Sequence, residues 1–471
     1  MNIRYIYLLL TVILISSCEK AIDVAIPKGK FTNELVYNTD DLAQAGMRGI
    51  YASMVNALAT NPFQGSLSGP LGLLSDEFVR ATYNSDQQLM LDNNLSPSMG
   101  IVSSIWNAYY NYILQTNIMY ESAERSSGLS GQVKNSLMAE ARFVRALCFF
   151  YMTNLYGDIP LTLTSDYELN RVMPVSDQGK VYAQVVADLI YARDHMTGNS
   201  TAPGFRHRPT KWSAEALLAR VYLYQKNWAA AEQSASNVIG QSNIFKMESL
   251  DNAFLTTSSE AIWALVPAGT NLYTGETNVL QGPITSNGNF RFSAYSLQQF
   301  ETGDQRYVKW TKTLSGTTAP YKFKTYANNQ VGAKAEAAMI LRLAEQYLIR
   351  AEARAMQDNL AGAIADIDVI RTRAGAVPNN TGANAGIAFK TIALSNPTIA
   401  KTDLIKLIYK ERMCELFGEF GHRWFDAKRA GSDLATFFEG RKPAIQPGDA
   451  YFPVPEREML FNPNIDQRDD Y

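Results

Sequence analysis

One stretch near the C-terminus constrains the fold more than any other part of the chain. It spans residues 404–431 and reads LIKLIYKERMCELFGEFGHRWFDAKRAG. Leu404 and Ile408 recur at the spacing of one helical face, and Glu411 and Glu415 continue that face. Carboxylates that point into an apolar interior are costly unless cations meet them. The stretch therefore predicts a helix with a buried network of charges, which fixes the end of the chain to the helices before it.

Cations that could meet these carboxylates follow within the same stretch, among them Lys428. Glu411 and Glu415 lie one turn apart, so a general acid/base pair is an alternative interpretation. Nearby arginines would keep both carboxylates ionised, which favours a structural role. We call the charged residues of this role the clasp, and they are Glu411, Arg412, Glu415, Glu419, Arg423, Asp426 and Arg429.

Two C-terminal segments carry a family resemblance. Residues 415–431 (ELFGEFGHRWFDAKRAG) and 451–471 (YFPVPEREMLFNPNIDQRDDY) resemble the closing motifs of the SusD/RagB family, in the same order and at the same end of the chain. Residues 139–157 (AEARFVRALCFFYMTNLYG) are similar to a further family motif. One departure is visible, because the family usually ends near Gly-Tyr and this chain ends Arg-Asp-Asp-Tyr.

The resemblance implies a fold and a function. The expected fold is mainly α, with TPR-like helical hairpins in a SusD-like α-α superhelix, long irregular loops and a few short strands. The expected function is that of a cell-surface lipoprotein, without enzymatic activity, which captures an oligosaccharide or a peptide. The expected partner is a SusC-like TonB-dependent outer-membrane transporter, over which the protein closes as a lid.

The N-terminus has the features of an export signal. Arg4 precedes an apolar run over residues 6–15, which is too short to span a bilayer. Ile-Ser-Ser-Cys follows at 15–18 and resembles a lipobox. We therefore expect residues 1–17 to be a lipoprotein signal peptide and Cys18 to carry the lipid. The mature protein is then anchored in the outer membrane and faces the cell exterior.

Composition excludes some functions and gives no sign of others. Lys and Arg number 43 against 45 Asp and Glu, so the net charge of −2 is unlike that of a nucleic-acid-binding protein. The three histidines, His195, His207 and His422, lack the spacing of a zinc site. The sequence shows no phosphate-binding glycine-rich motif and no nucleophile elbow. We expect no metal and no cofactor.

Helical periodicity runs through most of the chain, and one pattern occurs twice. Ala219 and Ala231 lie 12 residues apart, as do Ala351 and Ala363. Small residues at these positions let paired antiparallel helices approach closely, as in TPR repeats. In both copies a second helix is expected to begin just before the second alanine, at Trp228 and at Leu360. Residues 260–266 (EAIWALV) are short and apolar, and predict a buried strand.

Two irregular regions interrupt the helices, at residues 61–98 and 266–336. Such long stretches inside a compact domain are usually functional, although a solvated loop is the simpler interpretation. The chain is thus divided into an N-terminal part (about 18–245), a loop-rich insertion (about 246–335) and a C-terminal TPR-like pair with the family motif (about 336–471). Guanidinium, aromatic and amide groups suit the capture of sugars or peptides, and the candidate ligand contacts are Arg80, Tyr83, Asn84, Trp310 and Tyr321.

Some alternatives stay open. A lipid-anchored hydrolase would need a carboxylate with a raised pKa in a cleft. A periplasm-facing TPR-like scaffold would use its helical grooves to bind proteins. Cys148 and Cys414 are interpreted as small core residues, with a disulfide between them as the alternative. Trp106 lies beside an apolar helical stripe and is expected to be partly exposed.

Overall fold

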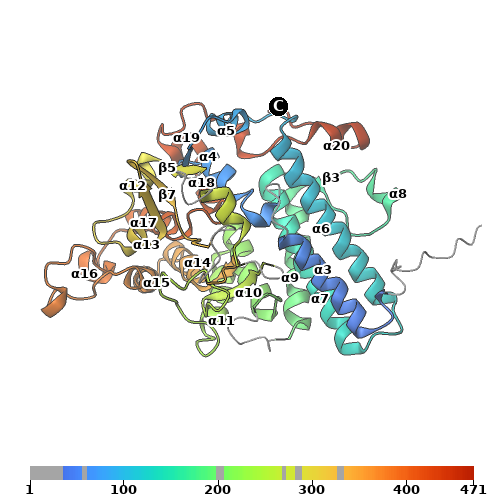
Figure 1. Ribbon diagram of the computed structural model, residues 1–471, viewed down its shortest axis with the longest axis horizontal. Helices are drawn as coiled ribbons and strands as arrows, with labels where there is room; N and C mark the ends of the chain where they lie inside the picture. The colour runs from blue at the N-terminus through green and yellow to red at the C-terminus, as the bar shows by residue number, and fades with distance from the viewer. Residues whose placement is uncertain (1–35, 56–60, 198–205, 268–271, 282–288, 326–333) are drawn as a thin grey trace, which may run out of the picture.

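The computed structural model describes residues 36–55, 61–197, 206–267, 272–281, 289–325 and 334–471 (Figure 1). The predicted signal peptide and Cys18 lie outside the described residues. Helices make up most of the described chain, and the strands are short and paired two by two. The predicted fold class, a mainly α protein with TPR-like helix pairs, is confirmed.

A layer of long helices forms the N-terminal side of the molecule. It consists of α3 (Asp40–Val55), α6 (Gly100–Arg125), α7 (Gly131–Tyr156) and α9 (Gln178–His195). The central member is α7, which is buried along its C-terminal half and packs against both α6 and α9. It ends at Tyr156, and Gly157 follows with a φ of +83°, a conformation that suits glycine.

Two antiparallel helix pairs continue this layer. The first pair is α10 (Lys211–Tyr224) with α11 (Trp228–Ile239), and the second is α14 (Leu343–Met356) with α15 (Leu360–Arg373). α11 packs on α14, so the two pairs are joined although more than 100 residues separate them in the sequence. Figure 1 shows α9, α10, α11, α14 and α15 following one another across the lower part of the molecule.

The two pairs share their local chemistry. Asn227 and Asn359 cap the second helices, and their side-chain oxygens accept hydrogen bonds from backbone N–H groups at 3.3 and 3.0 Å. Both predicted starts of a second helix, at Trp228 and Leu360, are confirmed. The four alanines of the repeat are fully buried where the helices meet, and they are Ala219, Ala231, Ala351 and Ala363.

The first irregular region is more ordered than the sequence suggested. It contains the 3₁₀ turn η1 (Pro62–Gln64), α4 (Ser68–Leu74), the strand β1 (Phe78–Arg80) and α5 (Ser85–Leu91). Residues 61–78 are all buried, and the chain reaches the surface only after them. The burial of this segment depends on its small residues. Helix α4 packs so closely against its neighbours that a Cβ added at Gly69 or Gly72 would clash with a phenylalanine ring.

The strands form antiparallel pairs. β1 pairs with β5 (Phe290–Phe292), and the predicted strand at 260–266 is β4 (Ala261–Leu265), which pairs with β8 (Ala338–Arg342). The remaining short elements of the middle of the chain are β2 (Ile159–Pro160), α8 (Tyr167–Asn170), β3 (Val175–Ser176), η2 (Thr277–Gln281), α12 (Ala294–Gln298), α13 (Gln305–Trp310), β6 (Thr311–Leu314) and β7 (Thr317–Pro320).

The C-terminal region returns across the molecule to the N-terminal helices. Phe452 N–H donates to the carbonyl of Leu155 at 2.7 Å, so the tail docks on the end of α7. Its last helix, α20, lies beside the C-terminus in Figure 1. The elements of this region are α16 (Ile392–Ser395), α17 (Lys401–Leu416), α18 (His422–Arg429), α19 (Leu434–Phe438) and α20 (Glu456–Phe461), with the 3₁₀ turns η3 (Gly382–Asn384) and η4 (Pro447–Ala450).

Two further findings concern single residues and the membrane. Cys148 and Cys414 are separate buried thiols, in agreement with their interpretation as core residues and against a disulfide.

Trp106 is buried and not partly exposed, because the C-terminal tail covers this part of α6. None of the helices in the described ranges is both long enough and apolar enough to cross a bilayer.

Candidate functional site

The clasp residues are all buried, and the glutamates have partners from distant elements. Glu411 binds Arg306 of α13 at 2.8 Å and also Arg371 of α15. Glu415 binds Arg342 at the end of β8 at 2.6 Å and also Arg373. The arginines that face the two glutamates are therefore not the sequence neighbours considered above.

The neighbouring arginines pair with other acids. Arg412 binds Asp426 at 2.7 Å, and Arg423 binds Asp76 at 2.7 Å, which joins the clasp to the buried N-terminal segment. Arg429 binds Asp426 at 2.6 Å and also Glu352 of α14. The Arg429–Asp426 pair lies within α18, and each of the other pairs holds a helix of the C-terminal region against another element.

The electrostatics of the clasp do not suit acid/base chemistry. Burial by itself would raise the pKa of Glu415, but Arg373 and Arg342 beside it lower that pKa to about 2. The carboxylate is therefore ionised at neutral pH, and it is fully buried beneath the arginines. A carboxylate with no proton to donate and no contact with solvent fits a structural role.

Arg80, Tyr83 and Asn84 lie together at the surface, between β1 and α5. Tyr83 has 75% of its surface exposed, and the Arg80 guanidinium lies 5.0 Å from its ring centre. Arg80 Nε donates to Gln88 Oε1 at 2.6 Å, which fixes the guanidinium. Asn84 caps α5, since its Oδ1 accepts from the Gln87 N–H at 2.9 Å. The three residues thus form a surface platform with an exposed aromatic ring.

A pocket of about 300 Å³ lies next to this platform, between the early segment and the insertion. It is adjacent because Arg80 pairs with Phe290 in the β1–β5 ribbon, and Phe290 lines the pocket. The lining combines amide, hydroxyl and apolar groups, which come from Gln64, Ser66, Pro70, Gln87, Ile101, Gly275, Asn278, Val279, Asn289 and Phe290. We call the platform and this pocket the platform site.

Trp310 does not belong to a ligand surface, and this expectation is corrected. Its side chain is fully buried, and its indole N–H donates to the Leu250 carbonyl at 2.8 Å. Phe254 and Phe417 pack on the ring with centroid distances of 5.5 and 6.3 Å. Tyr321 is half-buried instead, and its ring lies 5.6 Å from Lys312 Nζ on the β6–β7 hairpin. The structure does not show Tyr321 among the lining residues of the platform site.

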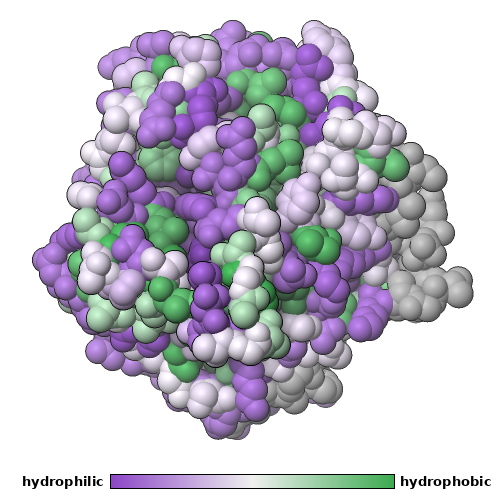
Figure 2. Space-filling model, turned by 90° about the vertical axis from the view of Figure 1, so that its left-hand side faces the viewer, coloured by the Kyte–Doolittle hydropathy of each residue, from purple (hydrophilic) through white to green (hydrophobic). Residues whose placement is uncertain are grey.

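The face that the insertion and the second helix pair form is mainly polar. Figure 2 shows this side with hydrophobic residues in small separate areas among hydrophilic ones. Among the described residues, no group of three or more His, Cys, Asp or Glu side chains is arranged to hold a metal ion.

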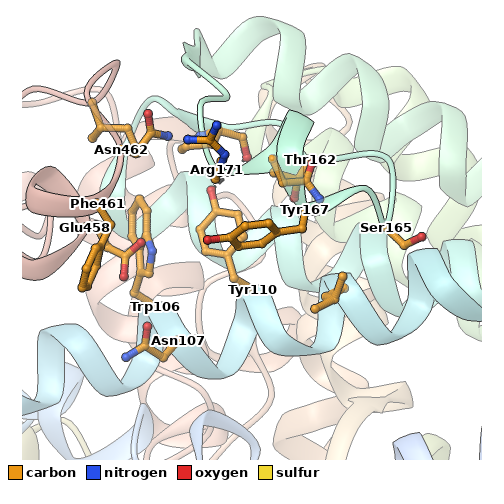
Figure 3. Close-up of a pocket in the computed structure, with 14 residues that line it drawn as sticks. Trp106, Asn107, Tyr110, Thr162, Ser165, Tyr167, Arg171, Glu458, Phe461 and Asn462 are labelled. Atoms are coloured by element: carbon orange, nitrogen blue, oxygen red, sulfur yellow. Dashed lines mark hydrogen bonds between the residues drawn. The ribbon is translucent and has the colours of Figure 1, made fainter. Parts of the chain in front are cut away.

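A larger pocket, of about 600 Å³, lies on another part of the surface and was missed in the sequence (Figure 3). It lies between α6, the segment that follows α7, and α20. A sequence signal for it exists, because Trp106, Tyr110 and Leu114 form a second apolar stripe at four-residue spacing beside the core stripe of α6. We call this cavity the α6–α20 pocket.

Sequence comparison relates both halves of the chain to one group of proteins. Residues 269–471 match the sequence model described as the SusD family, and residues 46–223 match the one described as "Starch-binding associating with outer membrane". SusD-like protein P25 of Formosa agariphila is 24% identical over an alignment of 526 residues, which covers 96% of this chain and 95% of that protein. A SusD-like protein of Bacteroides ovatus is 24% identical over 273 residues, 54% of this chain and 47% of that protein.

Solved structures share the fold. A SusD superfamily protein from Bacteroides thetaiotaomicron superposes with a TM-score of 0.74 at 23% identity, over 92% of this chain and 99% of that one. A protein described as a laminarin binding SusD-like protein superposes with a TM-score of 0.73 at 22% identity, over 92% of this chain and 100% of that one. At these identities the superpositions establish the architecture.

Proposed function

Because the chain belongs to the SusD/RagB family, we propose that it captures an oligosaccharide at the outer membrane and delivers it to a SusC-like TonB-dependent transporter. The observation that carries this proposal is the platform site, where an exposed tyrosine with a guanidinium over its ring lies beside a small pocket of mixed apolar and polar lining. The description of one matching family as starch-binding and the laminarin-binding relative of the same fold favour a glycan over a peptide.

The chemistry of the platform site suits a sugar. A pyranose ring has an apolar face of C–H groups that stacks on an aromatic ring, and hydroxyl groups around its rim that need hydrogen-bond partners. Tyr83 supplies the flat surface, while Gln87 and Asn289 supply amides at the pocket. The Arg80 guanidinium lies over one face of the Tyr83 ring and leaves most of the side chain open to a ligand. Binding of this kind breaks no bond in the ligand.

The proposal includes the anchor and the partner. Cys18 would carry the lipid, and the transporter would receive the ligand from beneath a lid formed by this protein. Protease treatment of intact cells tests the orientation, because a protein on the exterior is digested. Complete protection from the protease would contradict exposure on the cell exterior. Unchanged membrane retention after Cys18→Ala would contradict a lipid anchor at Cys18.

Mutation of Tyr83 tests the binding itself. Tyr83→Ala should weaken the binding of laminarin or amylopectin oligosaccharides at least tenfold, measured by isothermal titration calorimetry, because the stacking surface is lost. The melting temperature should stay the same because the ring is exposed. Val308→Ala is the control, since this side chain is also exposed, at 62%, but lies on α13.

Two results would contradict the proposal. Wild-type affinity in Tyr83→Ala would show that the platform does not bind the ligand. Release of shorter sugars, when the purified wild-type protein is incubated with either polysaccharide, would show a hydrolase instead.

A further inference from the structure

The α6–α20 pocket brings together side chains from three distant parts of the sequence. Its floor is α6, which carries Trp106 and Tyr110, and its walls are the segment after α7 and the helix α20 (Figure 3). It is twice the volume of the pocket at the platform site, at about 600 against 300 Å³. This is the size range of pockets that hold small organic ligands.

Aromatic rings dominate the lining. Tyr167 of α8 and Phe461 of α20 are 72% and 66% exposed, which is unusual for side chains of this size in a folded protein. Trp106 and Tyr110 lie between them on α6, with their ring centroids 4.9 Å apart. Exposed rings on opposite walls of a cavity offer stacking surfaces to a flat ligand.

Polar groups complete the lining and balance in charge. Glu458 and Arg171 carry opposite charges, and Arg171 is bound to Glu168 at 2.6 Å, so the guanidinium at the pocket already has a partner. Asn107 is exposed on the floor. Asn170 lines the pocket with its Oδ1 buried, and this oxygen has no hydrogen-bond partner within the described part of the chain. These groups favour a ligand that is neutral and rich in hydroxyl groups.

The walls are fixed in place before any ligand binds. Asn462, at the end of α20, donates to the Met173 carbonyl at 2.8 Å, which ties α20 to the segment after α7. Tyr110 OH donates to the Pro160 carbonyl at 2.8 Å, which ties that segment to α6. Asn170 Nδ2 donates to the Thr164 carbonyl at 2.7 Å and closes the loop that carries Tyr167. A preformed cavity of this kind loses little entropy on binding.

We propose that the α6–α20 pocket is a second saccharide-binding site, which takes a neutral pyranose unit between Tyr167 and Phe461. The proposal rests on the function proposed above and adds to it a separate contact for the same class of ligand. A purely aliphatic ligand would leave the Asn107 amide and Asn170 Oδ1 unpaired, and a peptide carboxylate would find the Arg171 guanidinium already paired with Glu168.

The two sites are neighbours along α6, although they open toward different sides of that helix. Ile101 lines the platform site and Trp106 the α6–α20 pocket, and five residues of helix rise about 8 Å and turn by about 140°. The Glu456 N–H at the start of α20 donates to the Pro97 carbonyl at 3.2 Å, in the loop between α5 and α6. Figure 1 shows α5 and α20 along the same upper edge of the molecule. Two linked contacts would raise the affinity for a polymer well above that for a short fragment.

Paired double variants test the second site. In Tyr167→Ala/Phe461→Ala both stacking surfaces of the pocket are removed. The matched control is Leu169→Ala/Leu460→Ala, which changes residues of the same two helices that are 56% and 78% exposed and do not line the pocket. The probes are laminarin and amylopectin, each as polymer and as short oligosaccharide. Affinity electrophoresis measures the binding of the polymers, and calorimetry that of the oligosaccharides.

We expect the pocket variant to lose at least tenfold in affinity for a polymer that wild type binds. The Leu169/Leu460 control should match wild type, and the melting temperatures should agree. Hydrogen exchange in wild type should slow at residues 158–171 and 456–465 when that polymer is added. Wild-type polymer affinity in the pocket variant would overturn the second site, and if Tyr83→Ala still lost binding, the proposed function would stand. If wild type bound none of the probes, both proposals would fail.

Discussion

Glu77 shows how burial at one residue sets a property of the whole protein. Its side chain is buried beside the turn between α17 and α18, where its Oε1 accepts a hydrogen bond from the Gly418 N–H at 2.9 Å. Burial raises the pKa of this carboxyl to about 8, although the Gly418 hydrogen bond lowers it somewhat. The side chain is therefore protonated at neutral pH in the folded protein. In the unfolded chain the pKa of the same carboxyl lies near the ordinary glutamate value of 4.5.

The first prediction follows from this difference in pKa. Below pH 4.5 both states hold the proton, and between about pH 5 and 8 only the folded state does. The contribution of Glu77 to stability is therefore fully present at low pH and is lost as the pH rises to 8. Glu77→Gln keeps a neutral hydrogen-bonding side chain, so this loss disappears. Its free energy of unfolding, relative to wild type, should rise by about 3 kcal/mol between pH 5 and 8.

Urea unfolding at both pH values measures this change. Glu439→Gln is the control, because that side chain is 75% exposed. Equal differences between Glu77→Gln and wild type at the two pH values would show that Glu77 is ionised in the folded protein.

The second prediction concerns Trp310. Trp310→Ala should lower the free energy of unfolding by about 3–5 kcal/mol, because it leaves a cavity between Phe254 and Phe417 and removes the hydrogen bond to Leu250. Chemical denaturation measures this loss, and Tyr83→Ala should change stability little because its ring is exposed. If Trp310→Ala lost ligand affinity while its stability stayed unchanged, Trp310 would be a ligand-contacting residue and not a core residue.

For some single residues, the sequence indicated that the side chain is buried but not which residues it contacts. The helical spacing of Glu411 and Glu415 with aliphatic neighbours indicated that they are buried, because periodicity is a local property. Their partners Arg306, Arg342 and Arg371 come from three other elements, and pairing of this kind depends on the tertiary structure. Trp310 stands among lysines and threonines, and its aromatic neighbours are more than 50 residues away in the sequence.

At the scale of elements, the repeated helix pair was the most predictable feature. The alanines mark where helices approach, and the turn of each pair has the same form, with positive φ at Lys226 and Asp358 just before the capping asparagine. A turn with positive φ is usually recognised in a sequence by a glycine. Neither Lys226 nor Asp358 is a glycine, so the sequence did not indicate these turns. The second apolar stripe on α6 is visible in the sequence, but it does not reveal the α6–α20 pocket, because the elements that form the walls come from distant parts of the chain.

The third prediction tests the close packing within a pair. Ala363 is fully buried where α15 meets α14 and α17, and Ala361 is exposed on the same helix. Ala363→Leu should lower the free energy of unfolding by about 1–3 kcal/mol, because the added methylene groups have no space. Ala361→Leu adds the same groups to the surface and should change stability little. Thermal denaturation compares the two variants, and equal melting temperatures would mean that the helices do not meet at Ala363.

At the scale of the whole molecule, buried ion pairs cross the divisions that the sequence suggested. Asp76 of the early segment binds Arg423 and Arg441 of the C-terminal region, at 2.7 and 2.8 Å. Arg220 of α10 binds Glu345 of α14 at 2.6 Å. The three-part division of the chain remains a proposal, and the ion pairs indicate that its parts unfold together.

The last prediction tests this coupling through Asp76. Asp76→Ala leaves the buried guanidinium of Arg423 without its carboxylate, which should cost about 3–5 kcal/mol of stability. Asp251→Ala is the control, because Asp251 also binds two cations, Lys309 and Lys324, but at a surface where its side chain is 49% exposed. Its removal should cost about 0–1 kcal/mol.

Circular dichroism and tryptophan fluorescence, followed through the same denaturant series, report on helices and on buried rings respectively. If the parts unfold together, both signals change at one midpoint in wild type and at one lower midpoint in Asp76→Ala. Two separate midpoints in the variant would show that the N-terminal and C-terminal parts fold independently and that the ion pair only holds them side by side. In that case the walls of the α6–α20 pocket, which come from both parts, would depend on this docking to stay in register.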